Sequence, residues 1–306
     1  MIKTEALTKR YGALTAVDGV SFTASPGEVL GFLGPNGAGK TTTMRILAGF
    51  VTATSGRASI CGHDVDSDSL AARTCLGYLP EGAPAYGEMT VRDFLNFIAD
   101  LRKLRGPARA RVTATIERLQ LQSVLTQTIE TLSKGFRRRV GLAQAIMHDP
   151  PVLILDEPTD GLDPNQKHEV RCLINDMAGD KTVIISTHML EEVDAVCTRA
   201  IIIARGRIVA DDTPQGLTAR SRYHNAVSLQ LTQPEQLAAA RAAVAALPQV
   251  ASVEVDERAA RLTALPREGA ALLGAISALS ESQGIALQEM YLEPGRLDDF
   301  FRTITA

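Results

Sequence analysis

The sequence predicts an α/β protein with a mainly parallel sheet, an antiparallel β flap and a helical insert, followed by a small α+β ferredoxin-like domain. Three observations support this fold class. An apolar strand runs into a glycine-rich loop and a helix, later apolar strands alternate with helical periodicity, and the pattern restarts near residue 221. We therefore expect a first domain at 1–220, with its helical part at about 84–149, and a second domain at 221–306.

The first domain opens with alternating apolar and polar side chains over residues 1–25, which predict short antiparallel strands. From Thr90 to about Asp149 the apolar period becomes helical, and one predicted helix face carries Phe94, Leu95, Ile98, Leu101 and Leu104. Between these regions a helix is expected at Thr41–Gly49. Core strands are expected at Glu28–Leu33, Gly77–Pro80, Val152–Leu155, Thr182–Ser186 and Ala200–Ile203.

The second domain shows a strand and helix order of βαββαβ, which is that of the ferredoxin-like fold. A last short helix is expected at Leu297–Thr303, after Pro294-Gly295. The expected strands are Val227–Leu231, Val250–Val255, Arg261–Ala264 and Ile285–Met290, and the helices are Pro234–Leu247 and Glu268–Gln283.

Charge and hydropathy exclude several classes of protein. The 306 residues carry a net charge of −3; residues 1–220 hold 25 Lys and Arg against 25 Asp and Glu, and residues 221–306 hold 7 against 10. A sequence-independent nucleic-acid binder needs a surplus of Lys and Arg, so we expect no nucleic-acid partner. No apolar run has the length of a secretory signal or a membrane span, which predicts a protein that works from the water side.

A glycine-rich loop after the first core strand predicts a site for a nucleoside triphosphate. Glycines let the backbone wrap a polyphosphate with its N–H groups pointing inward, and the next helix adds a positive dipole. In this motif Lys40 reaches the β- and γ-phosphates, and the Thr41 hydroxyl binds Mg²⁺. The motif alone also fits kinases, GTPases and motors. The expected ATP-binding residues are Gly34, Pro35, Asn36, Gly37, Ala38, Gly39, Lys40, Thr41 and Thr42.

Two carboxylates follow the apolar strand at 152–155. That strand should place Asp156 at the carboxyl edge of the sheet, where it can hold Mg²⁺ through water. Glu157 would then act as the general base on the attacking water. A carboxylate pair that merely caps a helix is commoner, but the phosphate loop favours the catalytic interpretation.

Residues 132–139, Leu-Ser-Lys-Gly-Phe-Arg-Arg-Arg, place a Ser and a Gly at the start of an amphipathic helix. Free N–H groups and the helix dipole make such a start an anion-binding site, here without a catalytic group. Ser133 is also an ordinary N-cap residue. We interpret the stretch as a second anion-binding helix start.

In these motifs the chain resembles the ATP-binding subunits of ABC transporters, with six motifs in order over residues 1 to about 220. The resemblance implies a P-loop NTPase core that binds ATP and Mg²⁺. It also implies that Ser133 and Gly135 bind the γ-phosphate of ATP held by a second, identical subunit. Three further roles are implied. Tyr11 would stack on adenine, and His188 would contact the γ-phosphate. Asp163 would make a contact across the dimer interface.

Two positions depart from the family pattern. Glu81 stands where the family usually has Gln; it is still expected to bind Mg²⁺ and water, with a changed charge balance around the γ-phosphate. Phe136 stands where the family signature usually closes with Gln. Both variants resemble an exporter branch of the family, and they bear on turnover rate more than on ATP binding.

The tail, chiefly Gln288–Phe301, resembles the C-terminal domain of ATPase subunits in ABC-2-type exporters, including gliding-motility and drug-export systems. A dimer-stabilising appendage and a regulatory domain are equally good interpretations of it. The resemblance implies a peripheral subunit at the cytoplasmic face of the inner membrane, which powers export by a separate transmembrane permease. Segment Gly82–Arg105 would receive the permease's cytoplasmic helix.

A soluble ABC ATPase acting on ribosomes or DNA is the alternative. Such proteins typically carry two ATP cores or a long coiled-coil insert, together with basic surfaces, and this sequence has none of these features. A small-molecule kinase would leave residues 132–139 and His188 unexplained.

Overall fold

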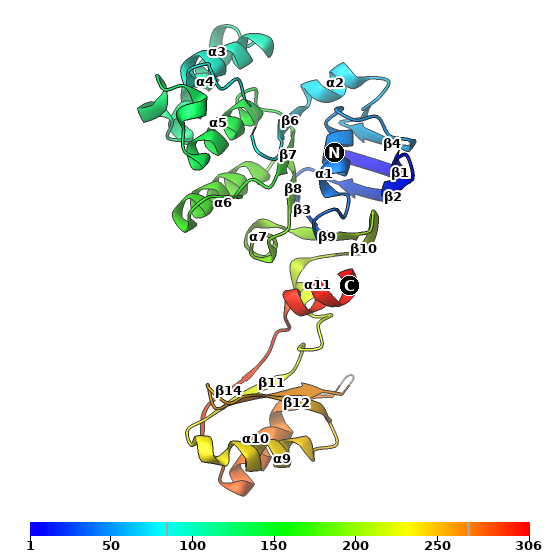
Figure 1. Cartoon of the computed structure of the whole chain (residues 1–306), viewed down its shortest axis with the longest axis vertical. Helices are drawn as coiled ribbons and strands as arrows, with labels where there is room; N and C mark the ends of the chain where they lie inside the picture. Colours follow the sequence, from blue (N-terminus) through cyan, green and yellow to red (C-terminus); the bar gives the residue numbers. More distant parts are fainter. Residues whose placement is uncertain (84, 268–269) are drawn as a thin grey trace. The chain divides into compact units, whose positions relative to one another are not determined.

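The computed structural model describes residues 1–83, 85–267 and 270–306, which form two compact units, 1–213 and 214–304 (Figure 1). The division lies before the expected boundary at 220, because helix α8 (Pro214–Thr218) packs on the C-terminal segment. A Cβ atom at Gly295 would lie 2.2 Å from the Thr218 carbonyl oxygen. The Arg296 N–H also donates to Ser221 Oγ at 3.0 Å.

The large sheet of the first unit has the strand order β10-β9-β3-β8-β7-β6. Its neighbouring strands are parallel except for the β10–β9 pair, which confirms the predicted mainly parallel sheet. Because β3, β7 and β8 are parallel, the residues that follow them lie at the same edge of the sheet, formed by the carboxyl ends of the strands. The strands are β3 (Val29–Leu33), β6 (Leu76–Leu79), β7 (Val152–Asp156), β8 (Thr182–Thr187), β9 (Arg199–Ala204) and β10 (Arg207–Asp212).

Each core strand sends alternate side chains to opposite faces of this sheet, and both faces are covered. On β7, Val152 and Ile154 belong to a cluster with helix α1 (Lys40–Leu47), whereas Leu153 and Leu155 pack with the helical insert. Burial on both faces explains why the residues of β7 before Asp156 are all apolar rather than alternately apolar and polar.

The predicted antiparallel flap is a second sheet with the order β2-β1-β4-β5. Residues 1–25 supply its two long strands, as expected, and the two shorter strands were missed in the sequence. The strands are β1 (Ile2–Tyr11), β2 (Leu14–Ala24), β4 (Ser55–Ile60) and β5 (His63–Asp64).

The helical insert contains α3 (Val91–Leu101), α4 (Ala110–Arg118) and α5 (Lys134–Ile146), which lie together in Figure 1. Phe94, Leu95 and Leu104 are buried as predicted, but Leu101 is 65% exposed. Leu101 is the last residue of α3, and its side chain lies on an open groove rather than in the core. Short 3₁₀ turns connect these helices: η1 (Gly106–Arg109), η2 (Gln122–Val124) and η3 (Ile129–Thr131).

Three further helices of the first unit were not predicted. They are α2 (Ser69–Thr74), α6 (Pro164–Ala178) and α7 (Leu190–Val196). Within the described part of the chain, no helix is both long and apolar enough to cross a membrane.

His148, just after α5, joins the insert to the core sheet. Its Nε2 atom lies 3.1 Å from the Leu76 carbonyl oxygen, and Nδ1 is buried without a hydrogen-bond partner in the described structure. Burial, assisted by the Arg102 cation, lowers the pKa of His148 from 6.5 to about 4. The folded protein therefore favours the neutral ring.

We expect this histidine to make stability fall in acid. Between pH 6.5 and 4, His148 is protonated in the unfolded chain but remains neutral in the folded chain. The contribution of His148 to the free energy of unfolding is therefore fully present above pH 6.5 and is lost as the pH falls toward 4. The loss should reach about 2–3 kcal/mol for wild type and be much smaller for His148→Gln. Urea unfolding at pH 7 and pH 4.5 measures it, with the exposed His168→Gln as control. Equal pH slopes for wild type and His148→Gln would contradict this assignment.

The second unit contains a four-stranded antiparallel sheet with the order β12-β13-β11-β14 and the βαββαβ chain order. Helices α9 and α10 pack on it through Val244 and Ile276 in a separate core. Residue Glu268, where the second helix was predicted to begin, lies outside the described residues. The elements are β11 (Val227–Leu231), η4 (Pro234–Gln236), α9 (Leu237–Ala245), β12 (Val250–Asp256), β13 (Arg261–Pro266), α10 (Leu273–Gln283), β14 (Leu287–Leu292) and α11 (Leu297–Thr305).

Candidate active site

The glycine loop lies between β3 and α1, and two of its glycines have no room for a side chain. A Cβ atom at Gly34 would lie 2.4 Å from the Ile203 carbonyl oxygen. A Cβ atom at Gly39 would lie 2.4 Å from the Ala16 carbonyl oxygen, and Gly39 has a φ of 106°. Neighbouring backbone therefore fixes the path of the loop, which a side chain at either glycine would displace.

Gly34→Ala should therefore displace the loop. The new Cβ would collide with the Ile203 carbonyl oxygen, a backbone atom that cannot rotate away as a side chain could. We expect a loss of about 1–3 kcal/mol in unfolding free energy together with the loss of ATP binding. Urea unfolding and titration with a fluorescent ATP analogue measure the two effects. Gly179→Ala is the matched control, since its Cβ would meet nothing within 4 Å. Normal ATP binding by Gly34→Ala would show that the loop tolerates the displacement.

Lys40 begins α1 and is 6% exposed. Its Nζ donates to the carbonyl oxygens of Gly34 at 2.6 Å and Pro35 at 3.2 Å, so the ammonium lies within the loop. Burial lowers the pKa of Lys40, while the charges of Glu157 and other nearby carboxylates oppose this shift. A polyphosphate in the loop would give this desolvated cation a direct counter-charge.

An open cavity of about 450 Å³ lies over the loop. It brings together residues from four separate parts of the chain, including Tyr11 on β1 and Glu81 after β6. The structure describes Ser133, Gly135 and Asp163, but they do not line this cavity. Sequence reasoning missed the contributions of Leu14 and Ala16. The lining residues are Tyr11, Leu14, Ala16, Asn36, Gly37, Gly39, Lys40, Thr41, Thr42, Glu81 and Glu157.

Asp156 ends β7 and is fully buried. Neither of its carboxylate oxygens has a hydrogen-bond partner among the described residues. Burial raises the pKa of Asp156, the carboxylates of Glu81 and Glu157 add to the shift, and the nearby Ser186 hydroxyl and Lys40 ammonium oppose it. An unpartnered buried carboxylate next to a phosphate loop fits a divalent cation, which would satisfy its charge.

No group of three His, Cys, Asp or Glu side chains that could hold a metal occurs among the described residues. A cation at this site would therefore also need the Thr41 hydroxyl and phosphate oxygens. This donor set of Thr41, Glu81, Asp156 and phosphate suits Mg²⁺, which prefers oxygen ligands and is commonly bound by one or two carboxylates together with substrate phosphates.

Glu157 and His188 come together from the ends of two adjacent strands. His188 Nδ1 lies 2.9 Å from Glu157 Oε1, and the Glu157 N–H donates to the Ser186 carbonyl at 2.8 Å. Glu157 has a φ of 51°, an uncommon value for a residue with a side chain. Its carboxylate borders the cavity, so this backbone geometry places a proton acceptor beside the phosphate loop.

Ser133 and Gly135 lie at the start of α5. The Ser133 hydroxyl accepts a hydrogen bond from the Phe136 N–H at 3.3 Å, which is ordinary N-capping. Ser133 is exposed, and Gly135 packs against the Gln166 side chain, 2.7 Å from where a Cβ would lie. Neither residue of this helix start lines the cavity over the phosphate loop.

The loop after Glu157 is tied to this helix start within the same chain. Lys134 Nζ lies 3.0 Å from Asp160 Oδ2, and Gly161, with a φ of 69°, lies against the same ammonium. Asp163 caps α6 in a capping box with Gln166, a pattern visible in the sequence but not used. Arg138, also missed, is 4% exposed and donates to the Pro80 carbonyl at 3.4 Å, close to the site carboxylates.

Comparison with known proteins gives concordant matches. The ABC transporter family profile matches residues 17–160. The probable multidrug ABC transporter ATP-binding protein YbhF of Escherichia coli is 38% identical over 223 residues, which are 72% of this chain but only 38% of YbhF. The chain thus spans well under half the length of that relative.

Other relatives match over more of their length. The daunorubicin resistance ATP-binding protein DrrA2 of Streptomyces coeruleorubidus is 34% identical over 99% of this chain and 94% of its own. The Nod factor export ATP-binding protein I of Paraburkholderia xenovorans is 39% identical over 71% and 72%, respectively. A solved structure of the ATP-binding subunit of an ABC transporter superposes with a TM-score of 0.67 at 27% identity, covering 72% of this chain and 92% of that one.

Proposed function

Because this chain belongs to the family of ABC transporter ATP-binding proteins, we propose that two copies bind two ATP molecules between them and power a separate permease that exports its substrate. One observation carries the shared-nucleotide part of this proposal. The phosphate loop, Glu81 and Glu157 border one cavity, while the exposed helix start at Ser133 lies outside it. Each chain thus carries two anion-binding half-sites, and facing a second copy would complete both.

The proposed chemistry follows from the positions of the side chains. Lys40 and the loop N–H groups bind the β- and γ-phosphates, and Tyr11 stacks on the adenine at the mouth of the cavity. Thr41, Asp156 and Glu81 would hold Mg²⁺, which neutralises phosphate charge when bound. Glu157 accepts the proton of the attacking water, and His188 orients that carboxylate and contacts the γ-phosphate. Ser133 and Gly135 of the partner copy bind the same phosphate from the other side.

A groove lined mainly by apolar side chains, together with Arg73, Arg102 and Gln144, supports a permease partner. It has a volume of about 320 Å³ and includes Ile98 and Leu101 from the segment at 82–105, in which Pro84 lies outside the described residues. Phe50 also lines the groove; it is 71% exposed and packs on Tyr78 with ring centroids 5.6 Å apart. Exposed large apolar side chains around a groove are typical of a surface that receives an amphipathic helix.

We assign the groove to a cytoplasmic helix of the permease, which would place the chain peripherally at the cytoplasmic membrane face. The names of the relatives, which refer to multidrug transport, daunorubicin resistance and Nod factor export, support export as the direction of transport.

Recovery of a membrane protein tests this assignment. Leu101→Asp should lower the amount of a multi-spanning membrane protein that co-purifies in mild detergent by about tenfold, because a charge at the centre of an apolar contact is costly. ATP hydrolysis by the isolated chain should stay unchanged. Leu70→Asp is the control, because Leu70 is 76% exposed and does not line the groove. Co-purification with ribosomes in place of a membrane protein would favour the alternative function.

A further inference from the structure

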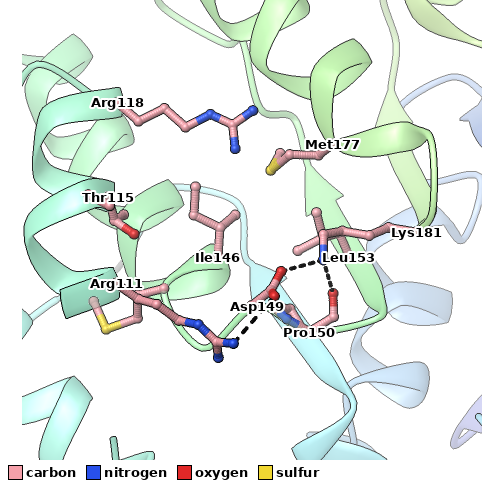
Figure 2. Close-up of a pocket in the computed structure, with 11 residues that line it drawn as sticks. Arg111, Thr115, Arg118, Ile146, Asp149, Pro150, Leu153, Met177 and Lys181 are labelled. Atoms are coloured by element: carbon pink, nitrogen blue, oxygen red, sulfur yellow. Dashed lines mark hydrogen bonds and ion pairs between the residues drawn. The ribbon is translucent and has the colours of Figure 1, made fainter. Parts of the chain in front are cut away.

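A second cavity, of about 220 Å³, lies between the helical insert and the core sheet of the first unit (Figure 2). Its floor is apolar: Leu153, Met147 and Met177 are at most 4% exposed, and the Ile146 side chain lies at its centre. Cavities that hold drug-sized ligands usually measure about 300–1,000 Å³, so this one suits a molecule with one short chain or ring.

Helix α4 supplies the polar wall. Arg111, Thr115 and Arg118 recur at intervals of four and three residues, so they lie on one face of the helix. The apolar side chains Val112 and Leu119 belong to the hydrophobic core instead. A helix that covers a core normally presents an apolar stripe, whereas this face presents two cations and small residues that leave space.

The charges around the cavity are unevenly paired. Lys181 Nζ donates to Asp149 Oδ1 at 2.6 Å and also to the Pro150 carbonyl oxygen. The hydrogen bond from Lys181 lowers the pKa of Asp149 and keeps this carboxylate anionic. Arg111 approaches the same carboxylate at 3.7 Å. The Arg118 guanidinium extends over the cavity (Figure 2), and its Nη2 donates a long hydrogen bond of 3.5 Å to Asp176 Oδ2. Asp176 does not line the cavity, so among its lining cations Arg118 is the one that no lining carboxylate pairs with in the described structure.

This cavity is separate from the nucleotide site. Its residues Pro150, Leu153 and Lys181 lie near the amino ends of β7 and β8, whereas Asp156 is the last residue of β7 and His188 follows β8. Leu153 and Asp156 are three residues apart on β7, so at about 3.3 Å per residue the two sites are roughly 10 Å apart along this strand.

We propose that this cavity binds a small amphiphilic monoanion, whose acidic head pairs with Arg118 and whose apolar body covers Ile146, Leu153 and Met177. The bound molecule contacts α4 of the insert and β7 of the core at once. It therefore holds these two parts of the first unit together. The inference does not depend on the proposed transport function, because it needs neither ATP nor a partner.

Octanoate and octylamine, which share a chain length and differ in charge, test the proposal by isothermal titration calorimetry on the full chain. We expect octanoate to bind saturably at one site, and octylamine to bind at least about tenfold more weakly. Arg118→Ala should weaken octanoate binding about tenfold, and Arg118→Lys by threefold or less. Arg92→Ala, which changes an exposed arginine on α3, should bind like wild type.

A second variant and a second measurement separate binding from misfolding. Ala114→Phe should fill the cavity and abolish octanoate binding while its circular dichroism and unfolding midpoint stay close to wild type. Octanoate should also slow hydrogen exchange of the α4 amides in wild type but not in Ala114→Phe. Equal affinity for octylamine, or undiminished octanoate binding by Arg118→Ala or Ala114→Phe, would overturn the proposal.

Discussion

Glu157→Gln should reduce ATP hydrolysis by a factor of about 10²–10⁴ and leave ATP binding intact. The amide keeps the shape of the side chain and its contact with His188, but it cannot accept a proton from water. Lys40 and the loop that bind the phosphates are unchanged. ATP should therefore remain bound, and the ATP-bound dimer should accumulate because hydrolysis no longer releases it.

Two measurements check this expectation. Phosphate release gives the rate, and light scattering after gel filtration gives the mass with and without ATP-Mg. Glu257→Gln makes the same chemical change at an exposed residue of the second unit and should behave like wild type. A Glu157→Gln protein that stays strictly monomeric at saturating ATP-Mg would count against the shared site.

Mixing two inactive variants should restore hydrolysis. Lys40→Ala disables the phosphate loop, and Ser133→Arg blocks the helix start that would face the ATP of the partner copy. In a mixed dimer, one site combines both defects, but the other combines an intact loop with an intact helix start. An equal mixture should therefore regain about a quarter of wild-type activity, because half of the dimers carry one good site out of two.

Each variant alone provides the control for this experiment. Ser133→Arg should bind a fluorescent ATP analogue normally, since Ser133 lies outside the nucleotide cavity, and Lys40→Ala should not bind it. If both half-sites acted on one nucleotide within a single chain, mixing would restore nothing. A fully active Ser133→Arg protein would likewise exclude the proposed role of this helix start.

Much of the first unit could be predicted from local sequence. The run Val152–Leu155 predicted a core strand because its side chains are buried on both faces of a parallel sheet. The glycine loop was recognisable because steric limits on its backbone leave few alternatives to glycine. The helix α6 was missed although Asp163 and Gln166 form a capping box, a signal that the sequence contains.

Local sequence predicted the parallel core strands, the phosphate loop and the carboxylate pair at the end of β7, because each depends on a short stretch of neighbouring residues. Packing between distant elements brings Glu157 to His188, buries Asp156 without a hydrogen-bond partner among the described residues, and leaves Leu101 exposed. It also placed the cationic face of α4 above an apolar floor. These features depend on contacts between residues far apart in the chain, and burial and charge pairing at such contacts arise only when the elements pack.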